Sequence, residues 1–334
     1  MGWTPWHDRL HRRLLAQPAM LPRGSRLLLA LSGGQDSMAL LALLRGLHPL
    51  HHWQLHLWHG DHGWHEGSSR IAQELQIWCC AEGLDLAVGR AALESPERSE
   101  AAARAWRYGA LAAEAERLSG LYPHNPCRIV ISAHTASDRA ETLLLQLARG
   151  SDLAGLGSQR HSRRLFKGSD LQLIRPLRDF SRADTARICS ELALPIWDDP
   201  SNRDPAYARN RIRAEVLPVL EQLHPGCSGR LADLAERMSQ LQDTQASLNA
   251  LALEHLSMTE GSLDRRRFGS LPLETRRTLL AHWLRVSGVP PLTASQLEEL
   301  AQATVAGSPA AGRDLSAGWR IHWRADALQL EQRP

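Results

Sequence analysis

Residues 27–44 read LLLALSGGQDSMALLALL and decide the fold of the first half of the chain. An apolar run ends in a small glycine-containing turn, and a second apolar run follows at once. This pattern is typical of a buried parallel strand, a tight loop and a packed helix. We therefore expect a strand at 27–31 and then a helix that runs to about Leu44.

The turn between these two runs carries the groups of a phosphate-binding loop, and it consists of Ser32, Gly33, Gly34, Gln35, Asp36 and Ser37. Gly33 and Gly34 let the backbone approach a ligand closely and adopt positive φ. The serine hydroxyls and the amides at the helix start can donate to phosphate oxygens, helped by the helix dipole. Asp36 can act on phosphate through Mg²⁺.

This loop is not of the Walker type, because Gly-Lys-Ser/Thr is missing from its end and Lys167 is the only lysine of the chain. A turn that binds nothing is the alternative interpretation. The pattern SGG-x-DS resembles the pyrophosphate loop of ATP pyrophosphatases, which cleave ATP between the α and β phosphates and adenylate a substrate. The loop alone does not identify that substrate.

Length and composition favour an ordinary globular protein with two domains. The chain has 334 residues, 43% of them hydrophobic, and a formal net charge of +3. No run approaches the length of a membrane span, and the first residues do not form a secretory signal. Five cysteines without regular spacing argue against a disulfide scaffold and fit a reducing cytoplasm.

The first half of the chain alternates between strand-like and helix-like segments. Strands are expected at 27–31, 53–58, 84–88 and 128–132, and helices at 69–82, 99–118 and 137–148. This alternation predicts an α/β fold with a doubly wound parallel sheet. A ligand then sits at the carboxyl ends of the strands, where the Ser32 loop and residues 134–138 both lie.

The second half is predicted to be mostly helical. A mobile loop is expected at 150–168, order resumes at 174–177, helices follow at 181–192, 210–223, 229–256, 272–286 and 293–304, and 318–330 alternates like a terminal strand or hairpin. We expect an ATP-binding catalytic domain at 1–225 and a helical connector at 226–247. A smaller, mainly helical domain follows at 248–334.

Two carboxylates mark the helix that follows the strand at 128–132. Asp138 and Glu141 are three residues apart, so their side chains share one helical face. Such a pair can share a metal ion or act as a base. An ordinary acidic first turn is the alternative, and His134 precedes the pair at the strand end.

A histidine-rich segment, HGDHGWH at 59–65, follows the second strand. His59, His62 and His65 are spaced like metal ligands, but no cysteine or carboxylate spacing completes a tetrahedral zinc site. We therefore interpret His59, Asp61 and His62 as the lining of a nucleotide pocket.

Arginines gather in and beside the expected crevice, at Arg104, Arg107, Arg149, Arg203, Arg209, Arg211 and Arg213. Any one of them could be part of a solvated surface. As a set they suggest contacts to phosphate or to an RNA backbone. Arg209, Arg211 and Arg213 cannot all share one helical face.

Together these segments closely resemble the tRNA(Ile)-lysidine synthetase family. The resemblance is carried by 59–63 (HGDHG), 103–108 (ARAWRY), 134–142 (HTASDRAET), 149–156 (RGSDLAGL), 175–177 (RPL), 199–202 (DPSN) and 209–213 (RNRIR). It is strong over about residues 20–225 and weak over 248–300. The chain departs from the family at Thr135, Ser137 and His65, where the family has histidine, aspartate and arginine.

The resemblance implies an adenine nucleotide alpha-hydrolase-like fold and a ligase. ATP would adenylate the wobble cytidine of an isoleucine tRNA with a CAU anticodon, and free L-lysine would then displace AMP and leave lysidine. The implied catalytic residues are Asp36, Asp138 and Glu141. ATP would be bound by the Ser32 loop together with His59, Asp61, His62 and His134, and Mg²⁺ by Asp36. The implied tRNA contacts are Arg104, Arg107, Arg149, Arg209, Arg211 and Arg213.

Two other functions stay open at this point. A tRNA thiolase of the same superfamily would need cysteine pairs, and the chain has no C-x-x-C. A non-catalytic RNA-binding module would not need Asp36, Asp138 and Glu141. The sequence leaves the oligomeric state open, with a homodimer as one candidate, and predicts no membrane partner.

Overall fold

The computed structural model describes residues 2–63, 67–91, 100–151, 153–157, 159–200, 204–258, 261–305 and 308–332. The chain forms two compact units, Met1–Ser239 and Gln240–Pro334. The division falls inside helix α10 (Cys227–Leu256), which covers all but the first residue of the expected connector at 226–247.

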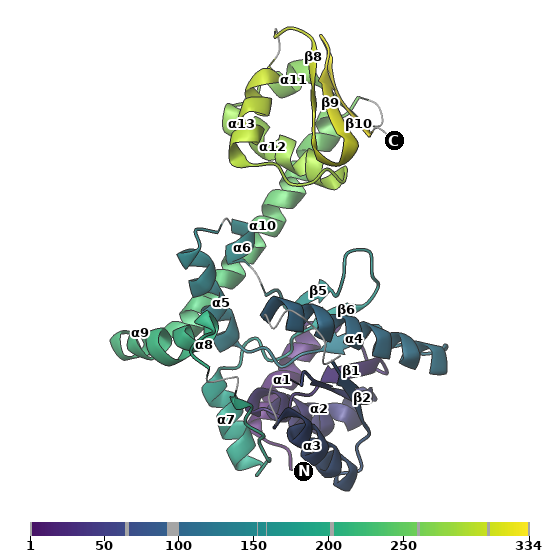
Figure 1. Cartoon of the computed structure of the whole chain (residues 1–334), viewed down its shortest axis with the longest axis vertical. Coiled ribbons are helices and arrows are strands. Elements are labelled where there is room, and N and C mark those ends of the chain that lie inside the picture. The colour runs from purple at the N-terminus through teal and green to yellow at the C-terminus, as the bar shows by residue number, and fades with distance from the viewer. Residues whose placement is uncertain are drawn as a thin grey trace. The chain divides into compact units, whose positions relative to one another are not determined.

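The first unit (Figure 1) is built on a six-stranded sheet, whose strands follow the order β3-β2-β1-β4-β6-β5. Its strands are β1 (Arg26–Ala30), β2 (Gln54–Asp61), β3 (Leu86–Arg90), β4 (Ile129–Ile131), β5 (Ser162–Arg164) and β6 (Gln172–Ile174). All neighbouring pairs are parallel except β5 with β6. The predicted parallel α/β sheet is therefore confirmed, with one antiparallel strand added at its edge.

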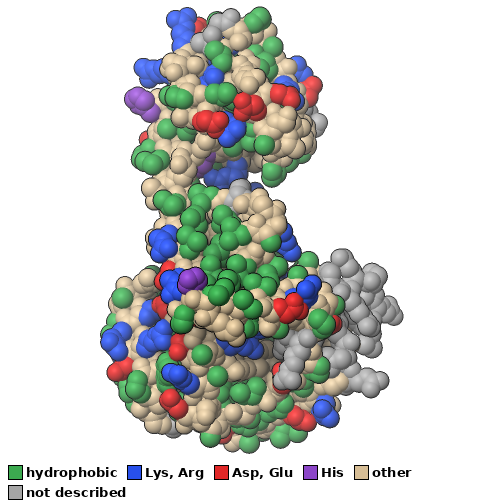
Figure 2. Space-filling view, turned by 90° about the vertical axis from the view of Figure 1, so that its left-hand side faces the viewer, with side chains coloured by type: hydrophobic (Ala, Val, Ile, Leu, Met, Phe, Trp, Pro, Cys, Tyr) green, Lys and Arg blue, Asp and Glu red, His purple; other side chains and the backbone are tan. Residues whose placement is uncertain are grey.

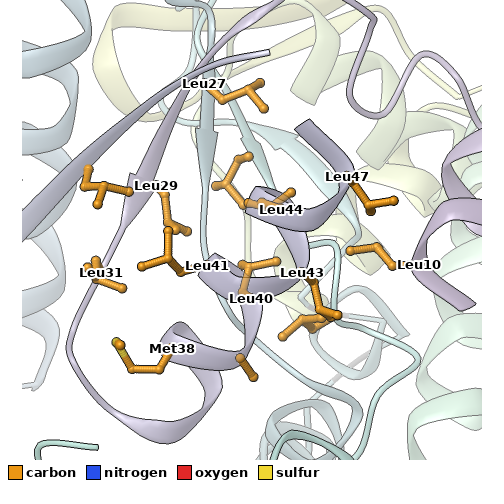
Figure 3. Close-up of a cluster of buried hydrophobic side chains, with 14 of the residues drawn as sticks. Leu10, Leu27, Leu29, Leu31, Met38, Leu40, Leu41, Leu43, Leu44 and Leu47 are labelled. Carbon is orange, nitrogen blue, oxygen red and sulfur yellow. The ribbon is translucent and has the colours of Figure 1, made fainter. Parts of the chain in front are cut away.

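Helices cover both faces of this sheet because the strands are apolar on both sides. Leu27, Leu29 and Leu31 pack with helix α2 (Gln35–His51) in one buried cluster, to which Leu10 also belongs (Figure 3). Leu28 lies on the opposite face, in a cluster with Leu111. This doubly buried strand explains the uninterrupted apolar run in the sequence.

The remaining helices of the first unit are α1 (Pro5–Ala16), α3 (Ser68–Ala81), α4 (Glu100–Leu121), α5 (Ala136–Ala148), α6 (Leu153–Leu156), α7 (Arg182–Glu191), α8 (Ala208–Arg211) and α9 (Leu217–Leu223). Side chains cap two of them, since Thr135 accepts from the backbone at the start of α5 and Ser181 does so for α7. No helix in the described part of the chain is long and apolar enough to cross a membrane.

Two segments differ from the sequence predictions. The expected mobile loop at 150–168 contains α6 and the edge strand β5, which short hydrogen-bonded pairing to β6 stabilises. The expected helix at 210–223 begins at Ala208 and contains a π-helical turn at Ile212–Val216. π-helical turns are found frequently at functional sites.

The second unit combines helices with a four-stranded antiparallel sheet of order β7-β10-β9-β8. Its strands are β7 (Ser262–Asp264), β8 (Ala311–Asp314), β9 (Trp319–Trp323) and β10 (Ala327–Gln332), and its helices after α10 are α11 (Arg265–Gly269), α12 (Leu273–Val286) and α13 (Ala294–Ala303). The predicted terminal hairpin corresponds to β9 and β10, and the other two strands were not predicted.

A buried arginine ties this second unit together. Arg265 is 1% exposed and donates to four backbone carbonyls. Its Nη1 lies 2.6 Å from the Arg324 oxygen, and its Nη2 lies 2.7 Å from that of Val305 and 2.9 Å from that of Ser308. The Nε donates to Thr304 at 3.3 Å. One side chain therefore joins the end of α13 to the turn between β9 and β10.

We expect Arg265→Met to destabilise the second unit by about 3 kcal/mol or more, because several buried carbonyls would lose their donor. Arg266→Met is the matched control, since that neighbouring side chain is 76% exposed and pairs with the exposed Asp326. Hydrogen exchange of the β9 and β10 amides measures the effect. Equal protection in the two variants would contradict the role of Arg265.

Candidate functional site

A cavity of about 400 Å³ lies at the carboxyl ends of β1, β2 and β4. Residues predicted for the site that line it are Ser32, Gly34, Gln35, Asp36, Ser37, His59, Asp61, His62, Arg104, Arg107, His134, Asp138, Arg209 and Arg213. Arg149 and Arg211 are exposed elsewhere on the first unit, and Arg203 lies outside the described residues. The structure thus brings five separate segments of the sequence, at 32–37, 59–62, 104–107, 134–138 and 209–213, to one crevice.

The phosphate-loop candidate is a tight turn between β1 and α2. Gly33 has φ +82°, a conformation that side-chain-bearing residues rarely adopt. Gly34 has an ordinary φ of −75° and forms the N-cap of α2. The Ser37 hydroxyl donates to the Gly34 carbonyl at 2.8 Å and lies 3.0 Å from the Ser32 hydroxyl. These hydroxyl contacts therefore fix the shape of the turn at the start of α2.

The side chain of Gln35, a residue that lines the cavity, also anchors this loop. Its Nε2 donates to the Arg182 carbonyl at 2.7 Å and to the Thr185 hydroxyl at 2.8 Å. Both partners belong to the first turn of α7. The side chain of Gln35 is thus engaged in fixing α7 beside the loop.

Asp36 is the carboxylate of the loop, and its side chain is 18% exposed. Thr185 donates to its Oδ1, and the Arg182 Nη1 lies 3.4 Å from its Oδ2. Burial, and then the charge of Asp138, raise the pKa of Asp36 to about 6. The carboxylate is therefore mostly ionised at pH 7.

One carboxylate beside a phosphate site is a donor set that suits Mg²⁺, which commonly binds through one or two carboxylates and substrate phosphates. The described residues contain no group of three or more histidine, cysteine or acidic side chains placed to hold a metal ion. Asp36 would therefore hold Mg²⁺ only together with phosphate oxygens.

The histidines of the cavity are neutral. The carbonyl of Leu31 accepts from the His59 Nδ1 at 2.9 Å, which assigns the proton to Nδ1 and leaves Nε2 as an acceptor. Burial lowers the pKa of His59, and burial with the Arg107 charge lowers the pKa of His62 to about 4. Burial and Arg175 lower the pKa of His134 to about 3.

Asp61 is occupied in holding its own loop. Its Oδ1 accepts from the Gly63 amide at 3.0 Å, and its Oδ2 accepts from the Ser69 hydroxyl at 2.8 Å. The neighbouring His62 receives a hydrogen bond from Arg107 at 3.0 Å. His65, the third histidine of this segment, lies outside the described residues.

Asp138 and Glu141 form an ion-pair cluster with Arg209 and Arg213. The Arg209 Nη2 lies 2.7 Å from the Asp138 Oδ1, and its Nε lies 2.7 Å from the Glu141 Oε2. The Arg213 Nε lies 2.6 Å from the Glu141 Oε1, and its Nη2 lies 3.7 Å from the Asp138 Oδ1. Glu141 is 1% exposed, so this cluster is shielded from bulk water on the α5 side.

Charge keeps Asp138 ionised. Burial, the largest single effect, would raise the pKa of Asp138, but Arg209, His134, the Thr135 amide and Arg213 together outweigh it and lower the pKa to about 2. The Thr135 amide and hydroxyl also donate to its Oδ2, at 2.8 and 3.0 Å. Thr135, one of the departures from the family pattern, thus caps α5 and orients Asp138.

Arg209 and Arg213 reach the same carboxylates because they lie four residues apart across the π-helical turn. Arg211 lies between them on the other face, where it pairs with the exposed Glu215 at 3.0 Å. This agrees with the expectation that the three arginines cannot share one face. The structure therefore places two of the predicted RNA contacts inside the cavity, paired with carboxylates.

Two family models match this chain, the PP-loop domain over residues 8–220 and the TilS substrate binding domain over residues 263–329. A relative named tRNA(Ile)-lysidine synthase, from Parasynechococcus marenigrum (strain WH8102), is 56% identical over 99% of this chain and 96% of its own length. This chain belongs to the tRNA(Ile)-lysidine synthase family. A second relative of that name, from Prochlorococcus marinus, is 45% identical over 98% of this chain and 96% of its own.

A solved structure shares the fold of this family member. The U34-tRNA thiolase NcsA from Methanococcus maripaludis with its 4Fe-4S cluster has a TM-score of 0.55 and 16% identity. The match covers 71% of this chain and 79% of that chain. Here, the described residues that line the cavity include no cysteine.

Sequence reasoning missed several residues of the cavity in this tRNA(Ile)-lysidine synthase relative. Arg182, Trp197 and Tyr207 also line it. Trp197 donates its backbone amide to the Gly33 carbonyl at 3.0 Å, a contact that no sequence pattern signals. One sequence pattern indicated where Arg182 lies, because this residue follows Ser181, the predicted cap of a helix.

Proposed function

We propose that this protein ligates free L-lysine to the wobble cytidine of an isoleucine tRNA with a CAU anticodon, using ATP and releasing pyrophosphate and AMP. Family membership over nearly the whole chain supports the reaction. The single structural observation that carries it is one cavity lined by Asp36 of the phosphate loop and by Asp138 of α5, whose partner Arg209 also binds the buried Glu141. Adenylation and lysine attack need these two parts side by side.

In the first step, the loop from Ser32 to Ser37 would hold the triphosphate through backbone amides and hydroxyls at the start of α2. Mg²⁺, held by Asp36 and phosphate oxygens, would supply positive charge against the phosphates. The neutral His59 would accept a hydrogen bond at Nε2 from a donor such as the adenine amino group. The cytidine carbonyl oxygen then attacks the α phosphate.

In the second step, Asp138 would receive the lysine side chain, and the buried Glu141 would add negative charge behind it. Their carboxylates suit a cationic ammonium, and the attacking amine must lose a proton before it is nucleophilic. The ionised Asp138 and the neutral His134 both lie on the cavity and can accept that proton. Arg209 and Arg213 would keep the two carboxylates ionised and in place, a role that their ion pairs favour over tRNA binding.

The tRNA would be held by both units. We propose that the C-terminal domain at 248–334, which contains the matched TilS substrate binding domain at 263–329, docks the body of the tRNA. Residues 240–334 contain ten acidic residues and ten arginines, so that unit carries no formal net charge. On the faces visible in Figure 2, acidic and basic side chains are interspersed. The first unit would therefore contribute most of the charge-driven contacts, through Arg104, Arg107, Arg149 and Arg211.

The test of the proposed function is pyrophosphate release followed by lysine transfer. The protein is mixed with ATP, Mg²⁺ and the CAU isoleucine tRNA, and labelled lysine is then added. We expect release that depends on this tRNA, and label in the tRNA only after lysine is supplied. Release without a tRNA requirement, or label that enters other tRNAs equally, would contradict the proposal.

The salt dependence of tRNA binding should distinguish arginines that contact the tRNA backbone from arginines that hold the carboxylates of the cavity. We expect Arg211→Ala to flatten the plot of log affinity for tRNA against log salt by about one unit, because one phosphate contact is lost. Arg209→Ala should leave the slope unchanged, because its guanidinium already neutralises two carboxylates. Filter binding at several salt concentrations measures both slopes. A flatter slope for Arg209→Ala would mean that Arg209 contacts the tRNA backbone, and it would contradict this assignment.

A further inference from the structure

Arg182 holds a fixed place between the phosphate loop and α5. Its backbone amide donates to the Ser137 hydroxyl at 3.1 Å, and its carbonyl accepts from Gln35 at 2.7 Å. Ser137 is a second departure from the family pattern, and here it positions the start of α7. The backbone of Arg182 is therefore joined to two segments that build the cavity, the phosphate loop and the start of α5.

The side chain of Arg182 lines the cavity beside the loop. It is 41% exposed, and its Nη1 lies 3.4 Å from the Asp36 Oδ2. A guanidinium has five N–H donors, so this one contact leaves most of them available to a ligand. The positive end of the α7 dipole lies at the same place, because Arg182 is the first residue of that ten-residue helix.

The phosphate loop lacks a cation of its own. Lys167, the single lysine of the chain, is absent from the described lining of the cavity. Among the other arginines of the lining, Arg209 and Arg213 bind the carboxylates of α5, and Arg107 binds His62. Arg182 instead contacts the loop itself through Asp36.

We propose that Arg182 binds the β and γ phosphates of ATP and stabilises the leaving pyrophosphate during adenylation. The inference rests on the proposed function. In that step the cytidine carbonyl oxygen forms a bond to the α phosphorus, and the bond from this phosphorus to the bridging oxygen breaks. The electron pair stays with pyrophosphate, and nothing is oxidised or reduced. The Arg182 guanidinium neutralises the negative charge that develops on the leaving pyrophosphate, because its planar N–H donors match the geometry of phosphate oxygens.

The contact with Asp36 fits this role. At 3.4 Å it is a weak ion pair, so phosphate oxygens can replace it at small cost, while Thr185 keeps its hydrogen bond to Asp36. Replacement of that contact by phosphate would leave one Asp36 oxygen available to Mg²⁺. The Arg182 side chain thus contacts the Asp36 carboxylate before ATP binds and the ATP phosphates afterwards.

The test compares Arg182→Ala and Arg182→Lys with Arg187→Ala, a control in which an exposed arginine of the same helix is removed. Three quantities are measured in the full-length protein: single-turnover pyrophosphate release, direct binding of pyrophosphate, and lysine transfer from tRNA already adenylated by the wild type. We expect Arg182→Ala to slow release about a hundredfold and to weaken pyrophosphate binding about tenfold. Lysine transfer should be unchanged, Arg182→Lys should recover part of both losses, and Arg187→Ala should resemble the wild type.

Wild-type release and wild-type pyrophosphate binding by Arg182→Ala would overturn the proposal. An equal loss in both half-reactions together with a lower melting temperature would also overturn it, because Arg182 would then be structural. If the wild type releases no pyrophosphate with the tRNA, the proposed function fails instead. The direct binding measurement still decides whether Arg182 is a pyrophosphate ligand in that case.

Discussion

Asp36→Asn should lower the rate of pyrophosphate release by about a thousandfold, because a metal ion beside the phosphates is worth several kcal/mol of charge stabilisation. The amide is nearly the same size and still accepts a hydrogen bond from Thr185, so the loop should keep its shape. What is lost is the negative charge at the one carboxylate of the phosphate loop. Single-turnover release with ATP, Mg²⁺ and tRNA measures the effect.

The same substitution should stabilise the folded protein at pH 7. The pKa of Asp36 is raised to about 6 from its ordinary value near 4, so its contribution to stability is complete below pH 4 and is lost as the pH rises through 6. Removing the charge should therefore add about 2 kcal/mol at pH 7. Asp170→Asn is the control, since that side chain is 79% exposed.

The wild-type rate should carry the signature of this titration. Pyrophosphate release should rise about tenfold per pH unit below pH 6 and level off above it, since the ionised carboxylate is the active form. Wild-type release by Asp36→Asn would contradict the assignment. So would a pH profile without a step near 6.

Short-range patterns made the fold and the centre of the site predictable. The apolar runs around Gly33 and Gly34 predicted β1, the loop and α2, because burial on both faces leaves an uninterrupted apolar strand. The spacing of Asp138 and Glu141 predicted a shared helical face, and both do contact Arg209. These features depend on residues within a few positions of one another.

Contacts between distant segments could not be predicted in the same way. Arg209 is 68 residues from Glu141 in the sequence, and only the fold brings the two together. Arg209 and Arg213 were therefore predicted to contact the tRNA, and their pairing with the carboxylates of α5 was not foreseen. Arg265 in the second unit is a similar case. Arginine is usually exposed, but this side chain is buried and donates to four backbone carbonyls of residues far from it in the sequence.

The acidic pair on α5 leads to the second prediction of large effect. Asp138→Asn should leave the binding of ATP almost unchanged and slow lysine transfer by a hundredfold or more, the order expected for loss of a general base. The new amide would also face the Arg209 guanidinium, which now has its acceptor at 2.7 Å. A site with two arginines and one carboxylate would repel the lysine ammonium, so the KM for lysine should rise as well.

Glu141→Gln should show how much of this effect is structural. Glu141 is 1% exposed and accepts from both arginines. Its neutralisation should therefore lower the free energy of unfolding by about 3 kcal/mol, and it should also slow lysine transfer. Asp138 contributes differently, because its pKa is depressed to about 2. Its stabilisation is present above pH 4 and is lost as the pH falls towards 2.

The decisive measurement starts from the adenylated tRNA. Enzyme, ATP and tRNA are mixed until pyrophosphate release is complete, labelled lysine is added, and its incorporation is followed for Asp138→Asn, Glu141→Gln and the wild type. Glu116→Gln, at an exposed position on α4, is the control and should behave as the wild type. If Asp138→Asn transfers lysine at the wild-type rate, or fails already at pyrophosphate release, then the carboxylates of α5 do not serve lysine attack. Slow transfer after normal release assigns the two half-reactions to the two ends of one cavity, with Asp36 at the phosphates and Asp138 at the incoming amine.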